Sequence, residues 1–179
     1  MTRPLPLLLT AAALFFSGCA TAPTSESGKA DKLVDANQTI ADARKNDPSL
    51  KKFFDEATGY AVFPTVGKGA IGVGGAYGKG IVYEKGKSVG FCDLSQATIG
   101  FQLGGQAYSE IIFFETPAAL EHFKSGNFAF SAQATAVALK SGSGANAKYA
   151  SGVAVFTLGE AGLMYEASIG GQKFSYKPQ

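Results

Sequence analysis

The sequence predicts an α+β fold: a strongly coiled antiparallel β-sheet or partly closed barrel with two N-terminal helices and one inserted helix. Three observations support this. Helical spacing of apolar residues ends near Ala57, a period of two begins at Tyr60, and Thr116-Pro117 carries the start signal of a helix between strand-like segments. With 46% hydrophobic and 17% charged residues over 179 positions, the composition excludes a disordered chain.

Residues 1–18 predict a signal peptide. A basic start at Arg3 precedes an apolar run over Leu5–Phe16, and Ser17-Gly18 provides small residues ahead of Cys19. The run is short for about 30 Å of hydrocarbon. The segment resembles a bacterial lipoprotein signal, with an ordinary cleaved signal or a membrane helix as alternatives. The resemblance implies that Cys19 is lipidated, with palmitate among its acyl chains.

Residues 19–28 are small, polar and contain Pro23, which is typical of a flexible tether, so the domain is expected over residues 29–179. By the same resemblance, Ala20 after the cysteine implies sorting to the outer membrane, with the domain facing the periplasm or the cell surface. Without Arg3 the charge is 15 basic against 14 acidic residues. This balance argues against a nucleic-acid partner, which requires a clustered basic excess.

The N-terminal part of the domain predicts two helices. The first covers Lys29–Asn46 and ends at Asp47-Pro48, and Ser49 is expected to cap a second, short helix that ends before Gly59. Lys29–Glu56 holds six basic and six acidic residues, which argues against a polybasic membrane-seeking helix. We therefore expect these helices to pack on the domain.

Between residues 70 and 80 the even positions are only Ala or Gly, which leaves one strand face almost without side chains. Such a face permits close backbone approach or a sharp bend of the sheet. Glu84–Lys87 predicts a tight hairpin. After this hairpin we expect a strand over Ala97–Glu115 that bends at Gly104-Gly105, and then a helix over Pro117–Lys124. A strand over Phe128–Leu139 and a loop over Lys140–Lys148 should follow. The chain is expected to end with a hairpin over Val153–Ile169 and a last strand over Lys173–Lys177.

Several spaced blocks resemble the SYLF domain family, which includes lipid-binding domains of eukaryotic adaptors and of bacterial envelope proteins. The blocks are Tyr60–Gly69, Gly72–Gly80, Ile99–Glu110, Tyr149–Phe156 and Leu163–Glu166, in the family order. The resemblance covers about residues 50–177. It implies a phospholipid-binding module, and some eukaryotic members also bind and bundle actin. This chain departs from the family in its charge-balanced N-terminal helix and in having no tryptophan.

Four lysines are the candidate headgroup-binding residues: Lys68, Lys79, Lys85 and Lys87. With Glu84 as the only acid between Gly67 and Gly90, this region carries a net charge of +3. Basic residues near an anionic bilayer contribute about 1 kcal/mol each. The alternative is that these lysines solubilise the edges and turns of a sheet.

No catalytic, metal or cofactor site is predicted. His122 is the only histidine, which excludes a cluster of histidine ligands. Gly67–Gly72 matches a GxGxxG spacing, but the chain continues as a strand, so it is not a dinucleotide fingerprint. Glu110 and Glu166 could form an acid–base pair, but we expect each to face solvent or to meet a buried glutamine such as Gln102, Gln106 or Gln133.

The predicted function is therefore non-catalytic binding of phospholipid membrane surfaces by a lipid-anchored envelope protein. The alternatives are a structural or protein-interaction module that receives an envelope or host protein, and a carrier of an apolar ligand inside a closed sheet. Cys92 is expected to be a buried small residue, because it is the only cysteine after Cys19.

Overall fold

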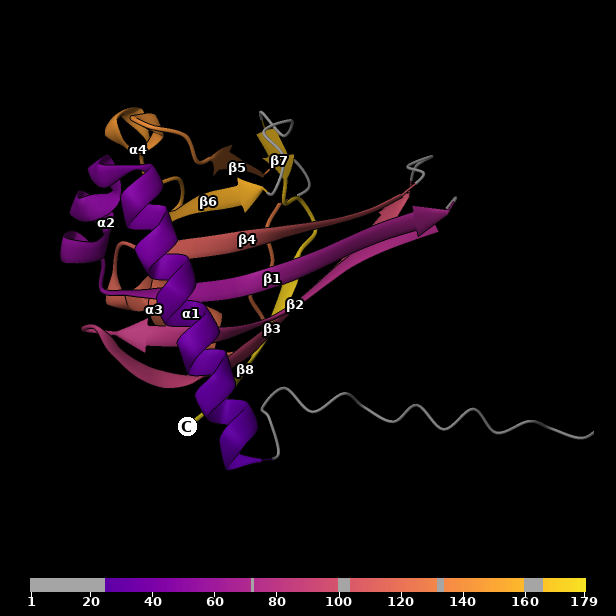
Figure 1. Cartoon of the computed structure of the whole chain (residues 1–179), viewed down its shortest axis with the longest axis horizontal. Coiled ribbons are helices and arrows are strands. Elements are labelled where there is room, and N and C mark those ends of the chain that lie inside the picture. Colours follow the sequence, from indigo (N-terminus) through magenta and orange to yellow (C-terminus); the bar gives the residue numbers. More distant parts are fainter. Residues whose placement is uncertain (1–24, 72, 100–103, 132–133, 160–165) are drawn as a thin grey trace, which may run out of the picture.

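The computed structural model describes residues 25–71, 73–99, 104–131, 134–159 and 166–179 (Figure 1). It confirms the α+β class. The elements in chain order are α1 Glu26–Asn46, the 3-10 helix η1 Pro48–Leu50, α2 Lys51–Glu56, β1 Gly59–Ile71, β2 Val73–Glu84, β3 Lys87–Ile99, β4 Gly104–Phe114, α3 Pro117–Lys124, β5 Thr135–Ala138, α4 Ser143–Asn146, β6 Val153–Gly159, β7 Glu166–Ser168 and β8 Lys173–Pro178.

The strands form one sheet of eight in the order β7-β5-β6-β4-β1-β2-β3-β8. Its pairs are antiparallel except for the parallel pair β5–β6. The sheet curls far enough for Ala129 to bridge Lys173 of the edge strand β8. Between the described parts of β7 and β8 there is no ladder, so the predicted partly closed barrel is not confirmed and the sheet is open.

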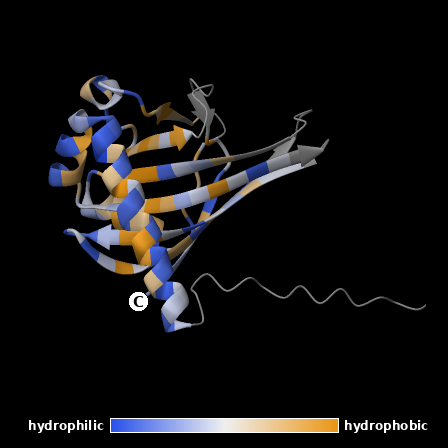
Figure 2. Cartoon of the chain, viewed as in Figure 1, coloured by the Kyte–Doolittle hydropathy of each residue, from blue (hydrophilic) through white to orange (hydrophobic). Residues whose placement is uncertain are grey.

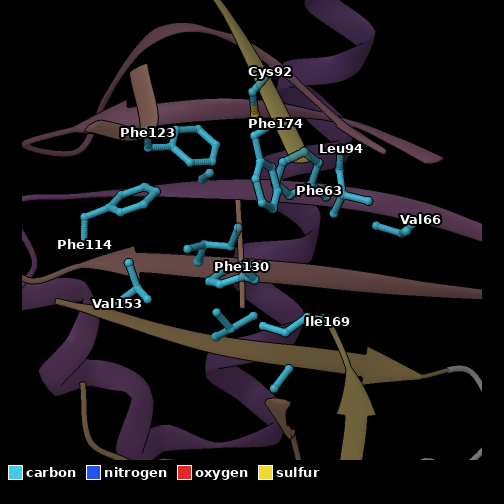
Figure 3. Close-up of a cluster of buried hydrophobic side chains, with 14 of the residues drawn as sticks. Phe63, Val66, Cys92, Leu94, Phe114, Phe123, Phe130, Val153, Ile169 and Phe174 are labelled. Atoms are coloured by element: carbon cyan, nitrogen blue, oxygen red, sulfur yellow. The ribbon is translucent and has the colours of Figure 1, made fainter. Parts of the chain in front are cut away.

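The two faces of the sheet bury separate apolar clusters. The outer cluster lies under α1 and α2 and includes Phe53, Tyr60 and Phe156; Figure 2 shows apolar segments in the strands that pass beneath α1. The inner cluster lies on the concave face. In Figure 3 its side chains converge from several strands and from α3, with Phe63, Phe123 and Phe174 near one another.

The helix predictions hold with shifted ends. α1 begins at Glu26 with Ser25 as its N-cap, so residues 26–28 are helical and not part of a tether. The predicted Ser49 cap is wrong: α2 follows Leu50 without a side-chain cap, and the 3-10 helix η1 ahead of it is capped by Asp47, whose Oδ1 accepts from the Ser49 backbone N–H at 3.0 Å. Thr116 caps α3 as predicted. The predicted loop 140–148 contains the short helix α4.

Three strand predictions are wrong because strand pairing is a tertiary property. Ala97–Glu115 is not one bent strand: it contains the end of β3 and all of β4, which run in opposite directions on either side of the β1–β2 hairpin. Among the described residues of Phe128–Leu139, only those of β5 form a strand. β6 and β7 do not form a hairpin, since β5 lies between them. The hairpin at Glu84–Lys87 and the last strand, β8, are confirmed.

The strand face that lacks side chains points into the inner cluster. A Cβ placed on Gly80 would lie 2.7 Å from Cδ1 of the Phe63 ring and 2.6 Å from the Val62 carbonyl oxygen. The glycine therefore leaves the space that the Phe63 ring fills when the sheet curls. Of the two interpretations of this face, close approach of neighbouring groups is confirmed at this position.

Candidate functional site

Two of the four candidate lysines lie together at the turn between β2 and β3. Lys85 and Gly86 form this turn with φ values of 50° and 76°, the left-handed conformation that a tight two-residue hairpin requires. Lys85 and Lys87 are both exposed. Neither forms an ion pair with another described residue, so the charges of both side chains remain available to a partner.

The acidic residue of this turn is already neutralised. Nζ of Lys124 on α3 lies 3.2 Å from Oε2 of Glu84 and 2.7 Å from Oε1 of Glu121. The hydrogen bond that Lys124 donates to Glu121, followed by the contribution of Glu84, raises the pKa of Lys124 despite its partial burial. The turn therefore presents a positive surface, because its one carboxylate faces a lysine of the body.

A third exposed lysine, Lys177, lies at this end of the sheet but on its outer face, whereas Lys87, opposite Glu84, lies on the inner face with α3. Lys177 of β8 is exposed and pairs in register with Phe91 of β3. The backbone position of Lys177 is four residues along β3 and one strand across from that of Lys87, which corresponds to about 14 Å. We call Lys85 and Lys87 the turn patch. No local pattern in the sequence pointed to Lys177, because only the long-range pairing of β3 with β8 brings it to this end of the sheet.

Lys68 and Lys79 lie apart from the turn patch and on opposite faces of the sheet. Lys68 is opposite Ala76, on the inner face, whereas Lys79 is opposite Asp93, on the outer face. Lys68 pairs with Ala76, which precedes Lys85 by nine residues, so the two lysines lie about 30 Å apart along the strand direction. The structure therefore does not bring the four predicted lysines together, and a flat bilayer cannot contact all four through one small surface.

The far ends of β1 and β2 project beyond the helices, as Figure 1 shows. We call this projecting part, residues 65–71 and 73–78, the arm. Tyr77 is 42% exposed there and lies opposite Gly67, whose missing Cβ would meet nothing within 4 Å. The arm thus presents an aromatic side chain beside a position without a side chain.

Glu110 is fully buried on the inner face, next to Tyr108 along β4. Nε2 of Gln172 donates to Glu110 Oε2 at 3.1 Å and lies 3.4 Å from the Tyr108 hydroxyl. Burial raises the pKa of Glu110 to about 8, although the hydrogen bond from Gln172 acts to lower it. The prediction that Glu110 meets a buried glutamine is confirmed, but its partner is Gln172 and not one of the three that the sequence suggested.

The remaining candidates lie outside the surfaces above or outside the described residues. His122 is exposed on α3 and its ring centroid is 5.3 Å from that of Phe128. Cys19, the signal peptide and the side chain of Glu166 are not described. In the part of the chain that is described, no helix is long and apolar enough to cross a membrane, and no group of three or more potential metal ligands occurs.

Comparison with known proteins gives two matches. Residues 95–178 match the family model of Ysc84, described as Las17-binding protein actin regulator. Over 129 residues, 71% of its length, the chain is 32% identical to a protein of Aeromonas veronii named Beta cell expansion factor A. The match covers 49% of that relative, so the chain spans about half the length of the curated protein it resembles.

Proposed function

Because the chain carries a SYLF (Ysc84) family domain, we propose that it binds anionic phospholipid surfaces without catalysis. The turn patch is the observation that carries this proposal. Its two exposed lysines lie on the tight turn between β2 and β3, and Lys124 holds the nearby Glu84. At about 1 kcal/mol per lysine near an anionic surface, the patch supplies about 2 kcal/mol, which is weak but sufficient for a tethered protein.

Lipid attachment at Cys19 is the second part of the proposal. A chain anchored there has six residue steps to Ser25, the cap of α1, and these span at most about 20 Å. The domain would remain close to the bilayer, so that weak headgroup contacts benefit from a high effective concentration. We place the protein at the outer membrane, facing the periplasm or the cell surface. Mass spectrometry of the purified protein tests the anchor: an acylated Cys19 supports it, whereas a chain that keeps residues 1–18 contradicts it.

Vesicle sedimentation tests the turn patch. The chain 20–179 is mixed at low salt with phosphatidylcholine vesicles that contain or lack phosphatidylglycerol. We expect preferential binding to the anionic vesicles, and a loss of about tenfold in Lys85→Glu/Lys87→Glu, since charge reversal turns attraction into repulsion. High salt should weaken the binding of the unchanged chain, because exposed charges are screened.

The matched control is Lys45→Glu/Lys140→Glu, which reverses the same number of charges at exposed positions away from the turn patch. This variant should retain most of the binding. Equal recovery with both kinds of vesicle would count against the proposal, as would an equal loss in the two double variants.

A protein-interaction module is the second candidate, and the arm is the observation that favours it. Exposed aromatic residues are enriched at protein interfaces, and Tyr77 is presented on a projecting hairpin. The matched family is itself described by protein binding and actin regulation. A photo-crosslinker at position 77 should give one dominant protein adduct in intact cells, while the same group at Val34, exposed on α1, should not. Similar adducts at both positions would argue against a specific interface.

A further inference from the structure

A pocket of about 550 Å³ lies where the curled sheet stays open. Along β6, the strand β5 pairs only with Phe156 and Thr157, so the first half of β6 lacks this neighbour. The segment around Phe130, which hydrogen-bonds to Gln172 and Gly171 ahead of β8, approaches from the other end of the sheet. The pocket occupies the seam between this segment and the start of β6.

The walls of the pocket are mainly apolar and draw on both clusters, with Ala154 and Phe156 from the outer one. Phe130, Val153, Val155 and Ile169 line it and are all buried members of the inner cluster. Figure 3 shows Phe130, Val153 and Ile169 on the same side of the cluster. Ligand pockets of proteins measure about 300–1,000 Å³ and have mainly hydrophobic walls. This pocket therefore has the size and the lining of a small-molecule site.

The polar groups of the pocket are hydroxyls and nitrogen groups. The side chains are those of Ser131, Ser151, His122 and Lys148, and none of the described lining residues is acidic. The turn at Ala150–Val153 is closed by backbone hydrogen bonds of 2.8 and 3.1 Å, which fixes Ser151 at the rim. Lys148 also borders a shallower depression that contains Glu56 and Glu115, but it forms no ion pair with any residue described.

We infer that this seam pocket binds a single-chain anionic amphiphile, with its apolar chain against Phe130 and Val155 and its head near Lys148 and His122. Burial of the ligand's apolar chain against an apolar wall stabilises the complex by about 0.8 kcal/mol per methylene. A cationic rim without carboxylates favours a carboxylate or phosphate head over an ammonium head. The pocket is separate from the turn patch, so either assignment can fail while the other holds.

Calorimetric titration of the chain 20–179, which contains the whole described fold, tests this site. The probes are laurate, dodecyl phosphate and dodecyltrimethylammonium, each below its critical micelle concentration. We expect saturable one-to-one binding of an anionic probe that is at least about tenfold tighter than that of the cationic probe. The two anionic probes distinguish a carboxylate from a phosphate head, and binding of either supports the site.

Two variants fill the pocket from its exposed side: Ala150→Trp and Val137→Trp, both at lining residues with exposed side chains. Each should weaken binding of the anionic probe about tenfold, because the tryptophan side chain occupies the volume that the apolar chain of the probe needs. Ala118→Trp, at an exposed position of α3 that does not line the pocket, is the matched control and should bind as the unchanged chain does. Circular dichroism identifies a variant that fails to fold, and the other variant then decides.

The position of the head group is tested by Lys148→Glu, which should remove the preference for the anionic probe. Lys177→Glu, at an exposed position of β8 that does not line the pocket, should leave this preference unchanged. The inference is overturned by the absence of saturable binding, by full affinity in the folded pocket-filling variants, or by equal affinity for the cationic probe. Vesicle sedimentation of the same variants separates the two sites, because Ala150→Trp should still sediment with anionic vesicles.

Discussion

Glu110 is an acidic residue inside an apolar cluster, and its chemistry follows from what surrounds it. Its Oε1 atom has no hydrogen-bond partner in the described structure, and its Oε2 atom accepts only from Gln172. A carboxylate deprived of water is costly unless it is paired, so the protonated form is favoured and the pKa rises to about 8. Glu110 is therefore a destabilising residue at alkaline pH.

The pH dependence of stability tests this conclusion. The ordinary pKa of a glutamate is about 4.5, and that of folded Glu110 is about 8. Between these two pH values, Glu110 keeps a proton in the folded protein that it has lost in the unfolded chain. The native state binds more protons there, so the free energy of unfolding falls as the pH rises, by at most about 1.4 kcal/mol per unit, and levels off above pH 8. Urea unfolding of Glu110→Gln should show a smaller decline and greater stability at pH 8.

The control for this experiment is Glu56→Gln, which changes an exposed carboxylate and should preserve the decline of the unchanged chain. If Glu110→Gln unfolds with the same pH profile as the unchanged chain, Glu110 is ionised in the folded protein and the conclusion is wrong.

At the scale of elements, Asp47 joins three of them. Its Oδ1 accepts from the Ser49 hydroxyl at 2.6 Å and from the Gly142 N–H at 3.2 Å, and its Oδ2 accepts from the Gly144 N–H at 2.6 Å. Burial alone would raise the pKa of Asp47, but these hydrogen bonds outweigh it and lower the pKa. One carboxylate thus ties the junction of α1 and η1 to the segment that forms α4.

The β1–β2 hairpin depends on glycine at one position and tolerates a side chain at another. Gly80→Ala should destabilise the domain by about 2 kcal/mol, because its Cβ would overlap the Phe63 ring and the Val62 carbonyl. Gly67→Ala, in the partner strand of the same hairpin, places its Cβ in open space and should be neutral or slightly stabilising. Denaturant midpoints of both variants measure the difference, and equal midpoints would contradict this role of Gly80.

At the scale of the whole molecule, the inner cluster is sealed on its β3 side. Cys92 has no exposed surface there and belongs to the same cluster as Leu94 and Phe174. Burial, followed by the charges of Asp93 and Glu110, raises the pKa of its thiol well above the ordinary value. Because the thiolate is the reactive form, Cys92 should react only when the curled sheet opens.

Thiol labelling of the chain 20–179 measures that opening, since Cys92 is then its only cysteine. Labelling with a disulfide reagent should proceed at the rate of global unfolding and accelerate with denaturant. Ser95→Cys in a Cys92→Ala background, at an exposed position of the same strand, should react at once. Rapid labelling of Cys92 without denaturant would show that the cluster opens locally.

The sequence by itself determined the elements whose signals are local. The end of α1 at Asp47-Pro48, the Thr116 cap of α3, the turn at Lys85-Gly86 and the alternation of small residues are encoded within a few neighbouring positions. Only the tertiary structure decided which strands are neighbours, because β-pairing joins residues far apart in the chain. The separation of Lys68 from Lys85, the arrival of Lys177, the Gln172 partner of Glu110 and the seam pocket all follow from that pairing.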